Sequence, residues 1–288
     1  MKLSNIFLST LAVLLCCTAC SKDEESFKGK DADASLSIAV KAAGSAVTKG
    51  FHPNDENELA GEAKVNNLSV LVFDESGAQL IGYGWQATNS EGEASILNVP
   101  AMTMRAQIVI VSNTPENSLA GVTSYSDFES KLAQLADQSQ SNLVMSSPVI
   151  TTQAPLVKGD NYLGYASMGS ENINGIAEPV EITRLAARLD LVNVKTDFTK
   201  TLLRNRTVRV EEVTILNQST ASRFFSRDYW GVVMATGHLG NSDATALNRD
   251  IANGSPINDT PYVHYVMEND GSCLLYTSPS PRDVEESR

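Results

Sequence analysis

The residues that most often carry catalysis or bind metals are few and scattered in this chain of 288 residues. Its three histidines, His52, His238 and His264, are so widely separated that they suggest neither a metal site nor a catalytic triad. Around Ser167, the segment Gly164–Gly169 lacks the glycine two residues before the serine that a nucleophile elbow requires. No dense Asp-x-Asp-x-Asx run predicts a calcium loop. We therefore expect no catalytic residue, no metal site and no cofactor.

The positions of cysteine and glycine exclude further classes of functional site. Cys16, Cys17 and Cys20 lie in the first 20 residues and Cys273 lies near the end, so the body between them has no cysteine. This excludes disulfide scaffolds, zinc ribbons, iron–sulfur clusters and cysteine nucleophiles within the body. The motif Gly82-Tyr83-Gly84 imitates part of a dinucleotide fingerprint, but a turn follows it and no helix N-terminus could hold a pyrophosphate. We predict a strand and a hairpin there.

Two arginines are the remaining candidates for ligand binding, because guanidinium groups bind carboxylates and phosphates. Arg184 and Arg188 lie in a predicted strand region and share a face if the strand is regular. We favour a structural role over anion binding. In that role they lie at a domain interface or pair with nearby acids such as Glu181 and Asp190.

Composition and charge are those of an acidic globular protein. Hydrophobic residues make up 42% and charged residues 19%, which excludes a wholly disordered chain. The chain has 22 Lys and Arg residues against 34 Asp and Glu, a net charge of −12. This sign argues against a nucleic-acid partner, because phosphates bind through cations.

The elements that must position these residues are predicted to be β-strands. Short apolar segments alternate with clusters of Gly, Asn, Ser, Asp and Pro, which is typical of a sandwich or barrel. Leu36, Ile38 and Val40 alternate with small or polar residues, which predicts a strand with one buried face. Asn67–Asp74 is almost continuously apolar, which predicts a strand covered on both faces. Further strands are expected at Gln79–Trp85, Ala94–Val99, Arg105–Ser112, Leu143–Thr151, Val180–Thr183, Ala187–Lys195, Thr207–Asn217, Arg223–Ala235 and Tyr262–Met267.

One segment departs from the β pattern. Ser126-Asp127-Phe128-Glu129 is a capping box, in which Ser126 caps a helix and Glu129 reaches back to the cap. Phe128, Leu132 and Leu135 follow helical spacing, which predicts a helix of about three turns whose apolar stripe packs on a sheet.

A domain boundary is predicted where Gly, Asn and Pro crowd together between Ser167 and Pro179. We expect an N-terminal domain at residues 35–178 and a second, incomplete domain at residues 179–272.

The N-terminus predicts export and a lipid anchor. Lys2 precedes the apolar run Ile6–Leu15, which is too short to span a bilayer, so residues 1–19 are predicted to be a signal peptide. The small residues before Cys20 resemble a bacterial lipobox, although Cys17 stands where leucine is preferred. The resemblance implies that Cys20 carries the lipid. An ordinary secretory signal with an incidental cysteine is the alternative.

Both flanks of the folded body have a further resemblance. Within an acidic tether expected at residues 20–34, Ser21-Lys22-Asp23-Glu24-Glu25 is similar to the surface-export tag of Bacteroidetes lipoproteins, which implies the outer face of the outer membrane. At the other end, Ser272–Asp283 resembles translated sequencing-adapter read-through. We therefore expect residues 273–288 not to be native and the true C-terminus to be missing.

The order of several segments relates the chain to a known family. Along the chain come Leu36–Val40, Thr48-Lys49-Gly50, the acidic stretch Asn54–Glu62, Val65–Asp74, Ile108–Pro115 with its final Asn-x-Pro, and Val180–Leu189. In this order they resemble the Bacteroidales-type fimbrillins, the major fimbrial subunit family of surface pili (type V).

The resemblance implies an all-β fold of two transthyretin-like Greek-key β-sandwich domains, with one short helix in the first domain and the second domain truncated. Members of this family are exported as lipid-anchored precursors. A trypsin-like protease cuts behind the first strand and releases it, and a strand of another subunit then fills the vacated groove.

Carried onto this sequence, the resemblance makes Leu36, Ile38 and Val40 the side chains that plug the groove temporarily. It makes Lys49–Gly50 the bond that is cut. The family commonly has arginine at the cleavage position. With lysine there, either the protease accepts lysine or the subunit stays anchored as a base or accessory component.

The implied function is that of a non-enzymatic structural subunit of a cell-surface fimbrium. It would polymerise by donor-strand exchange with other fimbrial subunits, be held in the outer membrane by lipid, and support adhesion. One alternative is a surface-anchored lipoprotein that binds glycan or protein without polymerising. Another, from a different class, is a surface hydrolase of β-sandwich form.

Overall fold

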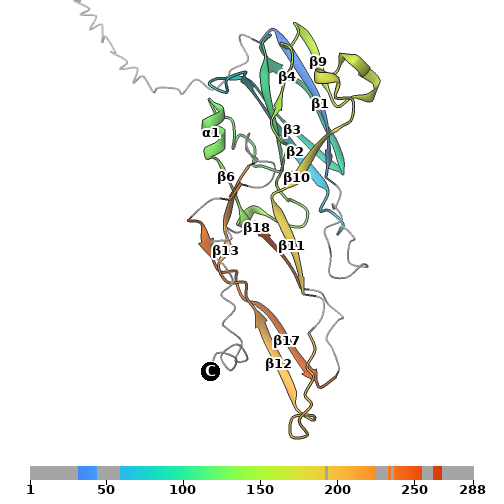
Figure 1. Cartoon of the computed structure of the whole chain (residues 1–288), viewed down its shortest axis with the longest axis vertical. Helices are drawn as coiled ribbons and strands as arrows, with labels where there is room; N and C mark the ends of the chain where they lie inside the picture. Colours follow the sequence, from blue (N-terminus) through green and yellow to red (C-terminus); the bar gives the residue numbers. More distant parts are fainter. Residues whose placement is uncertain are drawn as a thin grey trace, which may run out of the picture.

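The computed structural model describes residues 32–43, 59–191, 194–224, 233–234, 237–254 and 262–267. Within these ranges the protein is mostly β, with a few short helices, and it has two β regions. The molecule is elongated, with a large sheet at one end and a two-stranded ribbon at the other (Figure 1).

The first region is one sheet that closes on itself. Its order is β10-β7-β5-β2-β3-β4-β1-β9, and β10 also pairs with β1, so the sheet is barrel-like. A short strand, β8, pairs with β5 beside this path. The strands are β1 (Ala34–Ala42), β2 (Lys64–Asp74), β3 (Leu80–Glu91), β4 (Glu93–Ala101), β5 (Ala106–Ser112), β7 (Met145–Ser146), β8 (Ile150–Thr151), β9 (Gly159–Leu163) and β10 (Val180–Arg184).

The central strands β2 and β5 are buried on both faces. From β2, Val70 and Val72 pack inside the ring, whereas Leu71 and Phe73 pack in a second apolar cluster on the outer face. β5 alternates in the same way, and all seven of its residues are buried. This confirms the prediction from the apolar run Asn67–Asp74, because a strand covered on both faces has no solvent side to alternate with.

The second region has a four-stranded sheet and a separate ribbon. The sheet has the order β11-β18-β13-β16, and the ribbon pairs β12 with β17. A third sheet, β15-β14-β6, takes one strand from the first region and so links the two regions by backbone hydrogen bonds. Bounds are β6 (Leu132–Gln134), β11 (Ala186–Leu191), β12 (Thr207–Val213), β13 (Gln218–Ser219), β14 (Ala221–Arg223), β15 (Val233–Met234), β16 (Leu239–Gly240), β17 (Thr245–Ala252) and β18 (Tyr262–Met267).

The predicted three-turn helix is wrong in its length and its cap. The helix α1 spans only Tyr125–Ser130, and Ser124 caps it by accepting a hydrogen bond from the Asp127 backbone N–H at 3.1 Å. After Lys131, which is extended, the chain enters β6, where Ala133 pairs with Ser222. Helical spacing alone could not reveal this partner strand. A one-turn 3₁₀ helix, η1 (Leu135–Asp137), follows.

Most of the other strand predictions are confirmed, and the differences have a common cause. The expected strand Leu143–Thr151 forms only the two short strands β7 and β8, and the polar strands β9 and β17 were not foreseen. The expected linker contains two 3₁₀ helices, η2 (Ala166–Glu171) and η3 (Ile173–Gly175). β10, expected to begin the second domain, pairs with β1 and β7 of the large sheet. The differences in the strands depend on partners that are distant in sequence.

The glycines of the Gly82-Tyr83-Gly84 motif allow β3 and β4 to approach closely. Gly82 pairs with Ala101, and a Cβ atom at Gly82 would lie 2.7 Å from the Pro100 carbonyl oxygen. A Cβ atom at Gly84 would lie 2.8 Å from a methyl group of Val99. The motif is therefore part of a strand, as predicted.

This close approach gives a test of the fold. Replacing Gly82 by alanine forces backbone atoms apart, so we expect Gly82→Ala to lower the free energy of unfolding by about 1–3 kcal/mol. Gly121 is the matched control, because a Cβ atom there meets nothing within 4 Å. We expect Gly121→Ala to be neutral or slightly stabilising. Urea unfolding followed by fluorescence measures both, and equal stability of the two variants would contradict the packing described.

Candidate functional site

The first strand closes the ring of the large sheet. β1 pairs antiparallel with β4, where Leu36 is opposite Val99. On its other side β1 pairs in parallel with two strands in succession, β9 along its first half and β10 along its second half. Figure 1 shows β1 in blue beside β9 and β4. Without β1, the edges of β4 on one side and of β9 and β10 on the other would be unpaired.

The three predicted plug residues fill the interior of this ring. Leu36, Ile38 and Val40 are each 0% exposed and belong to the inner apolar cluster. Burying three side chains of this size contributes about 6 kcal/mol. Because whole domains are stable by only about 5–15 kcal/mol, a region that lost β1 and gained no replacement would keep little of its stability.

Hydrogen bonds fasten β1 at both ends. The Thr103 backbone N–H donates to the Asp33 carboxylate at 2.8 Å, and hydrogen bonds from Thr103 hold the pKa of Asp33 below its usual value. At the other end, the Ala43 N–H donates to the Ile182 carbonyl at 2.8 Å. The strand is therefore held along its whole length, up to the last residue described before position 59.

The other predicted site residues lie outside the described residues. Cys20 belongs to residues 1–31, and Lys49 and Gly50 belong to residues 44–58, between β1 and the turn before β2. Lipidation of Cys20, cleavage at Lys49–Gly50 and the temporary role of β1 all stay predictions.

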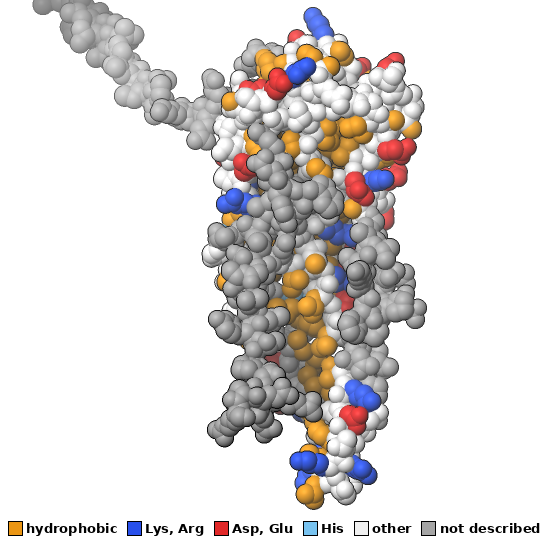
Figure 2. Space-filling view, viewed as in Figure 1, with side chains coloured by type: hydrophobic (Ala, Val, Ile, Leu, Met, Phe, Trp, Pro, Cys, Tyr) orange, Lys and Arg blue, Asp and Glu red, His pale blue; other side chains and the backbone are white. Residues whose placement is uncertain are grey.

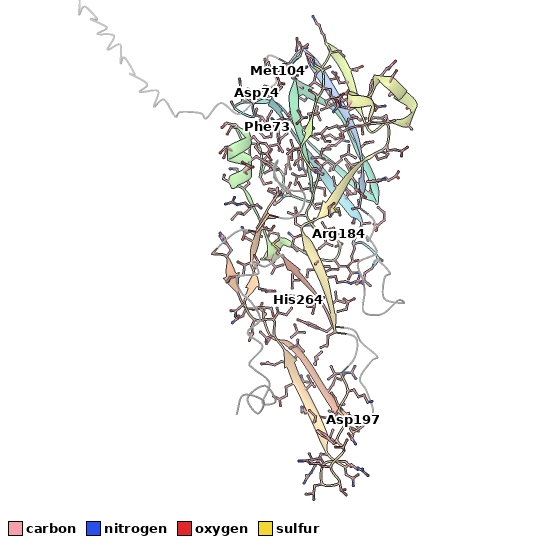
Figure 3. The ribbon with its side chains drawn as sticks, in the orientation of Figure 1. Phe73, Asp74, Met104, Arg184, Asp197 and His264 are labelled. Carbon is pink, nitrogen blue, oxygen red and sulfur yellow. The ribbon has the colours of Figure 1, made fainter. Side chains whose placement is uncertain are left out.

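A buried acid joins the two regions at the end of this connection. Glu62 is 4% exposed, and its carboxylate accepts from Arg188 of β11 at 2.8 Å and from the Tyr265 hydroxyl of β18 at 2.8 Å. Its backbone carbonyl accepts from Arg184 Nε at 2.9 Å. Figure 3 labels Arg184 where the large sheet gives way to the second region. We call Glu62, Arg184, Arg188, Asp190 and Tyr265 the joint cluster.

Charge balance within the joint cluster depends on this acid. Burial disfavours the charged form of Arg188, but hydrogen bonds and the negative charges of Glu62 and Asp190 raise its pKa above the usual value. Burial, together with the neighbouring Glu62 carboxylate, raises the pKa of the Tyr265 hydroxyl. The hydroxyl therefore stays protonated and can donate to Glu62.

The prediction that Arg184 and Arg188 have a structural role is confirmed. Arg188 pairs with Asp190 at 2.9 Å, and both arginines lie at the contact between regions. Their main partner, Glu62, was not singled out. Nothing in the acidic stretch Asn54–Glu62 distinguishes Glu62 as an acid that becomes buried.

No group of three or more His, Cys, Asp or Glu side chains in the described ranges could hold a metal ion. Among the same residues, no helix is both long and apolar enough to cross a membrane.

Comparison with known families gives two adjoining matches. The profile of the major fimbrial subunit protein (FimA) family matches residues 34–184. The profile of the C-terminal domain of Fim1C-like fimbrium tip subunits matches residues 185–279. The two matches meet at the end of β10, where the chain leaves the large sheet.

Two individual fimbrial proteins are also similar to this chain in sequence. A Parabacteroides distasonis protein named as a candidate fimbrium tip subunit, Fim1C, is 47% identical over 270 residues, which cover 93% of this chain and 71% of that protein. A type-2 major fimbrium subunit FimA of Porphyromonas gingivalis is 26% identical over 287 residues, covering 93% of this chain and 68% of the relative.

Solved structures share the fold. A candidate cell adhesion protein from P. distasonis superposes with a TM-score of 0.77 at 46% identity, over 83% of this chain and 71% of that one. The fimbrilin FimA from P. gingivalis W83 superposes with a TM-score of 0.57 at 17% identity, over 84% and 68% of the two chains.

The joint cluster predicts that two acidic residues, Glu62 and Glu181, contribute differently to the stability of the protein. Glu62→Ala leaves Arg188 and Tyr265 without their shared partner, so we expect the free energy of unfolding to fall by about 3 kcal/mol. Glu181, exposed on β10, is the matched control, and Glu181→Ala is expected to change stability by less than about 0.5 kcal/mol. Denaturant unfolding compares them. Equal midpoints would contradict a joint that depends on Glu62.

A histidine in β18 predicts a pH dependence. His264 stacks on Tyr262 and hydrogen-bonds Gln218 at 3.0 Å, and burial lowers its pKa below the usual 6.5. Just below pH 6.5 the unfolded chain therefore binds more protons at this site than the folded chain, so stability falls as the pH falls. We expect His264→Asn to lose this part of the pH dependence between pH 7.5 and 5. If the stability of the parent chain and of His264→Asn changed with pH in the same way, this role of His264 would be contradicted.

Proposed function

This chain belongs to the FimA family of major fimbrial subunit proteins, which are non-enzymatic structural subunits, and on that premise we propose that it is a tip subunit of a cell-surface fimbrium. In this proposal β1 is a temporary strand. Cleavage at Lys49–Gly50 frees it, and a strand of the neighbouring fimbrial subunit takes its place. The assembled fibre then supports adhesion.

The observation that supports this proposal most directly is the position of β1. It is the one strand that pairs with β4 on one side and with both β9 and β10 on the other, and it ends where the predicted cleavage segment begins. Cutting residues 44–58 would leave β1 attached only by hydrogen bonds and side-chain packing. A strand of similar alternation could then replace it without breaking a covalent bond.

The energetics favour replacement over simple loss. An empty groove exposes the apolar interior and two rows of unpaired backbone groups, which is an aggregation hazard unless another strand covers it. An incoming strand restores main-chain hydrogen bonds, while side chains at the Leu36, Ile38 and Val40 positions fix its register. Assembly is therefore driven by the same burial that stabilises the precursor.

The tip assignment is compatible with a single vacated groove and is supported by the second half of the chain. A subunit at the end of a linear fibre contacts one neighbour, so one vacated groove is sufficient to attach it. The similarity of residues 185–279 to the C-terminal domain of Fim1C-like tip subunits supports this position over one in the stalk.

The second region is less completely covered than the first. β12 and β17 form a two-stranded ribbon, which has little stability by itself. Figure 2 shows hydrophobic side chains gathered along this region. Among the described residues, its exposed large apolar side chains are those of Leu189, Leu202, Leu203, Leu216 and Leu239. Such exposure is typical of a surface that contacts another protein, and it supports a role within an assembly.

The remaining expectations belong to the same proposal. The two β regions are two transthyretin-like Greek-key sandwiches. Residues 1–19 are a signal peptide, Cys20 carries the lipid, and the residues between Cys20 and β1 form a tether to the outer membrane. A trypsin-like protease removes the lipid together with β1.

Brief trypsin digestion of the full chain tests the cleavage step. We expect mass spectrometry to find a cut after Lys49, whereas Lys41 and Lys64 are held in paired strands of the large sheet. Lys49→Gln should abolish this cut. The control Lys41→Gln, in β1, should leave it unchanged.

Strand replacement is tested on the cut protein with a labelled peptide of residues 32–43. We expect uptake of the peptide, and at least about a hundredfold weaker uptake of an Ile38→Asp peptide, because a carboxylate cannot be buried in the apolar ring. An Ala39→Asp peptide is the control, since Ala39 lies on the opposite face and is not fully buried. Cut protein that remains a monomer and exchanges no peptide would overturn the proposal.

The lysine at position 49 favours one second candidate. If the processing protease requires arginine, the subunit keeps β1 and its lipid and acts as a non-polymerising, surface-anchored glycan- or protein-binding accessory component. Resistance of the Lys49–Gly50 bond in the digestion would support that candidate.

A further inference from the structure

The free end of the β12–β17 ribbon is rich in cations, although the chain as a whole is acidic. Residues 195–209, which lead into β12, contain five cationic side chains and one carboxylate, those of Lys195, Lys200, Arg204, Arg206, Arg209 and Asp197. Residues 34–184, in contrast, contain 7 Lys and Arg against 16 Asp and Glu. The ribbon end is therefore a positive end on an otherwise negative molecule.

These cations lie around two exposed leucines on a tight turn. The Leu203 backbone N–H donates to the Lys200 carbonyl and the Arg206 N–H donates to the Leu203 carbonyl, each at 2.9 Å. Residues 200–206 thus form two successive turns. Leu202 is 88% exposed and Leu203 is 40% exposed. The turn therefore presents apolar surface between cationic side chains.

Most of the cations at this end have no acidic partner. Arg209 pairs with Asp250 at 3.4 Å, but the other four cations are exposed and form no ion pair with another described residue. Arg204 Nε donates to the Thr199 carbonyl at 3.2 Å, which holds this side chain beside the turn. The positive charge at the turn is therefore available to an anionic partner.

This end lies far from the groove through which the subunit is attached in the proposed function. β1 belongs to the large sheet, and the ribbon lies at the opposite end of the elongated molecule (Figure 1). Figure 2 shows Lys and Arg side chains beside hydrophobic ones at this end, and Figure 3 labels Asp197 near it. If a neighbouring subunit binds in the β1 groove, the ribbon end is the outermost part of a terminal subunit.

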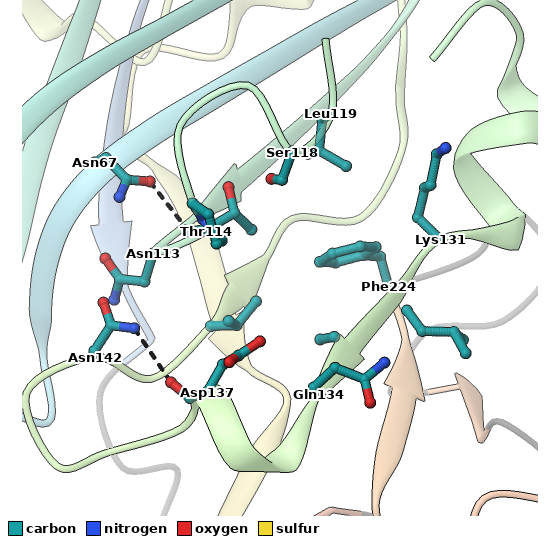
Figure 4. Close-up of a pocket in the computed structure, with 14 residues that line it drawn as sticks. Asn67, Asn113, Thr114, Ser118, Leu119, Lys131, Gln134, Asp137, Asn142 and Phe224 are labelled. Atoms are coloured by element: carbon teal, nitrogen blue, oxygen red, sulfur yellow. Dashed lines mark hydrogen bonds between the residues drawn. The ribbon is translucent and has the colours of Figure 1, made fainter. Parts of the chain in front are cut away.

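A pocket of about 420 Å³ beside Phe224 is a weaker candidate for binding (Figure 4). Phe224 is 4% exposed and stacks on Phe128, so its ring offers little open face. The lining includes both Lys131 and Asp137, so its charge favours neither anions nor cations. The ribbon end, in contrast, combines an excess of positive charge with protruding apolar side chains.

A cationic turn with protruding leucines fits an anionic lipid surface. Cations are attracted to anionic headgroups, and apolar side chains beside them can enter the boundary between headgroups and acyl chains. A soluble polyanion would leave Leu202 in water, and a protein partner would have to supply an apolar groove for a protruding turn.

The acidic first region does not prevent such a contact. β12 has 7 residues and therefore spans about 20 Å, which separates the turn from the large sheet. The Debye length is about 8 Å at physiological salt, so repulsion between the large sheet and the lipid surface is largely screened.

We propose that residues 195–206 contact an anionic lipid bilayer, with Leu202 entering its interface and Lys200, Arg204 and Arg206 binding its headgroups. The inference deepens the adhesive part of the proposed function and rests on it for the outward position of this end. The contact does not need cleavage of β1, because none of these residues belongs to the large sheet. The lipid contact and the assembly step can therefore fail or succeed separately.

The test measures co-sedimentation of the uncut full chain with vesicles of phosphatidylcholine alone and with vesicles that also contain phosphatidylserine. The ratio of the two partition coefficients is compared between variants, because every variant has the same N-terminal residues. We expect the double variant Arg204→Gln, Arg206→Gln to lower this ratio about twentyfold, since each cation near an anionic surface contributes about fivefold. We expect Leu202→Ser to lower it about tenfold, because serine gains little by leaving water.

Matched controls change the same kinds of side chain in the first region. The double variant Arg105→Gln, Lys158→Gln removes the same charge from two exposed positions, and Leu97→Ser replaces a leucine of β4 that is 52% exposed. Each control is expected to keep the ratio of the parent chain. All the substituted positions are exposed, so the variants are expected to fold.

Three results would overturn the proposal. They are no gain in binding when phosphatidylserine is added, the same ratio for the parent chain and for Arg204→Gln, Arg206→Gln, or an undiminished ratio for Leu202→Ser. The last result would assign the cations to a soluble polyanion or an acidic protein instead. None of these results would affect peptide uptake by the cut protein, so a failed lipid contact is distinguishable from a failed assembly mechanism.

Discussion

The structure depends most on the pairing of β1 with strands on both of its sides. β1 connects β4 to β9 and β10 and so turns an open sheet into a ring, and its three large side chains fill the centre of that ring. The inner face of β1 is buried, and in the proposed assembly β1 is the strand that a neighbouring subunit replaces. Under that proposal, the precursor and the assembled subunit are stabilised by the same apolar interior.

The outer face of the large sheet explains how the two regions stay together. Leu71 and Phe73 of β2 pack outward against a cluster that also contains Phe224 and Met267 of the second region. Strand pairing between β6 and β14 and the joint cluster around Glu62 add directional contacts. Apolar packing supplies the area of contact, and the buried hydrogen bonds restrict how the regions can be arranged.

The β1 groove and the pocket beside Phe224 lie on different faces of the large sheet and differ in chemistry. The β1 groove is apolar inside and offers backbone groups along its edges, which suits an extended strand. The pocket beside Phe224 has polar walls around a nearly covered aromatic ring, and its buried apolar residues belong to the outer cluster rather than to the ring that β1 closes.

The sequence by itself determined the elements whose signals are local. Alternation in Leu36–Val40, the long apolar run of β2, and the close glycines of β3 each predicted a strand, because side-chain period and backbone sterics act over a few residues. The order of these segments was also enough to indicate the family, and the absence of cysteines from the body excluded several classes of site.

The tertiary structure decided everything that needs a distant partner. It shortened the predicted helix, because residues after Lys131 pair with β14, and it placed β10 in the large sheet beside β1. It buried Glu62 among Arg188 and Tyr265, and it brought Phe224 to a pocket lined by residues 80 to 157 positions earlier. Strand pairing, burial of a charge and formation of a pocket are contacts between segments far apart in sequence, and no local pattern contains them.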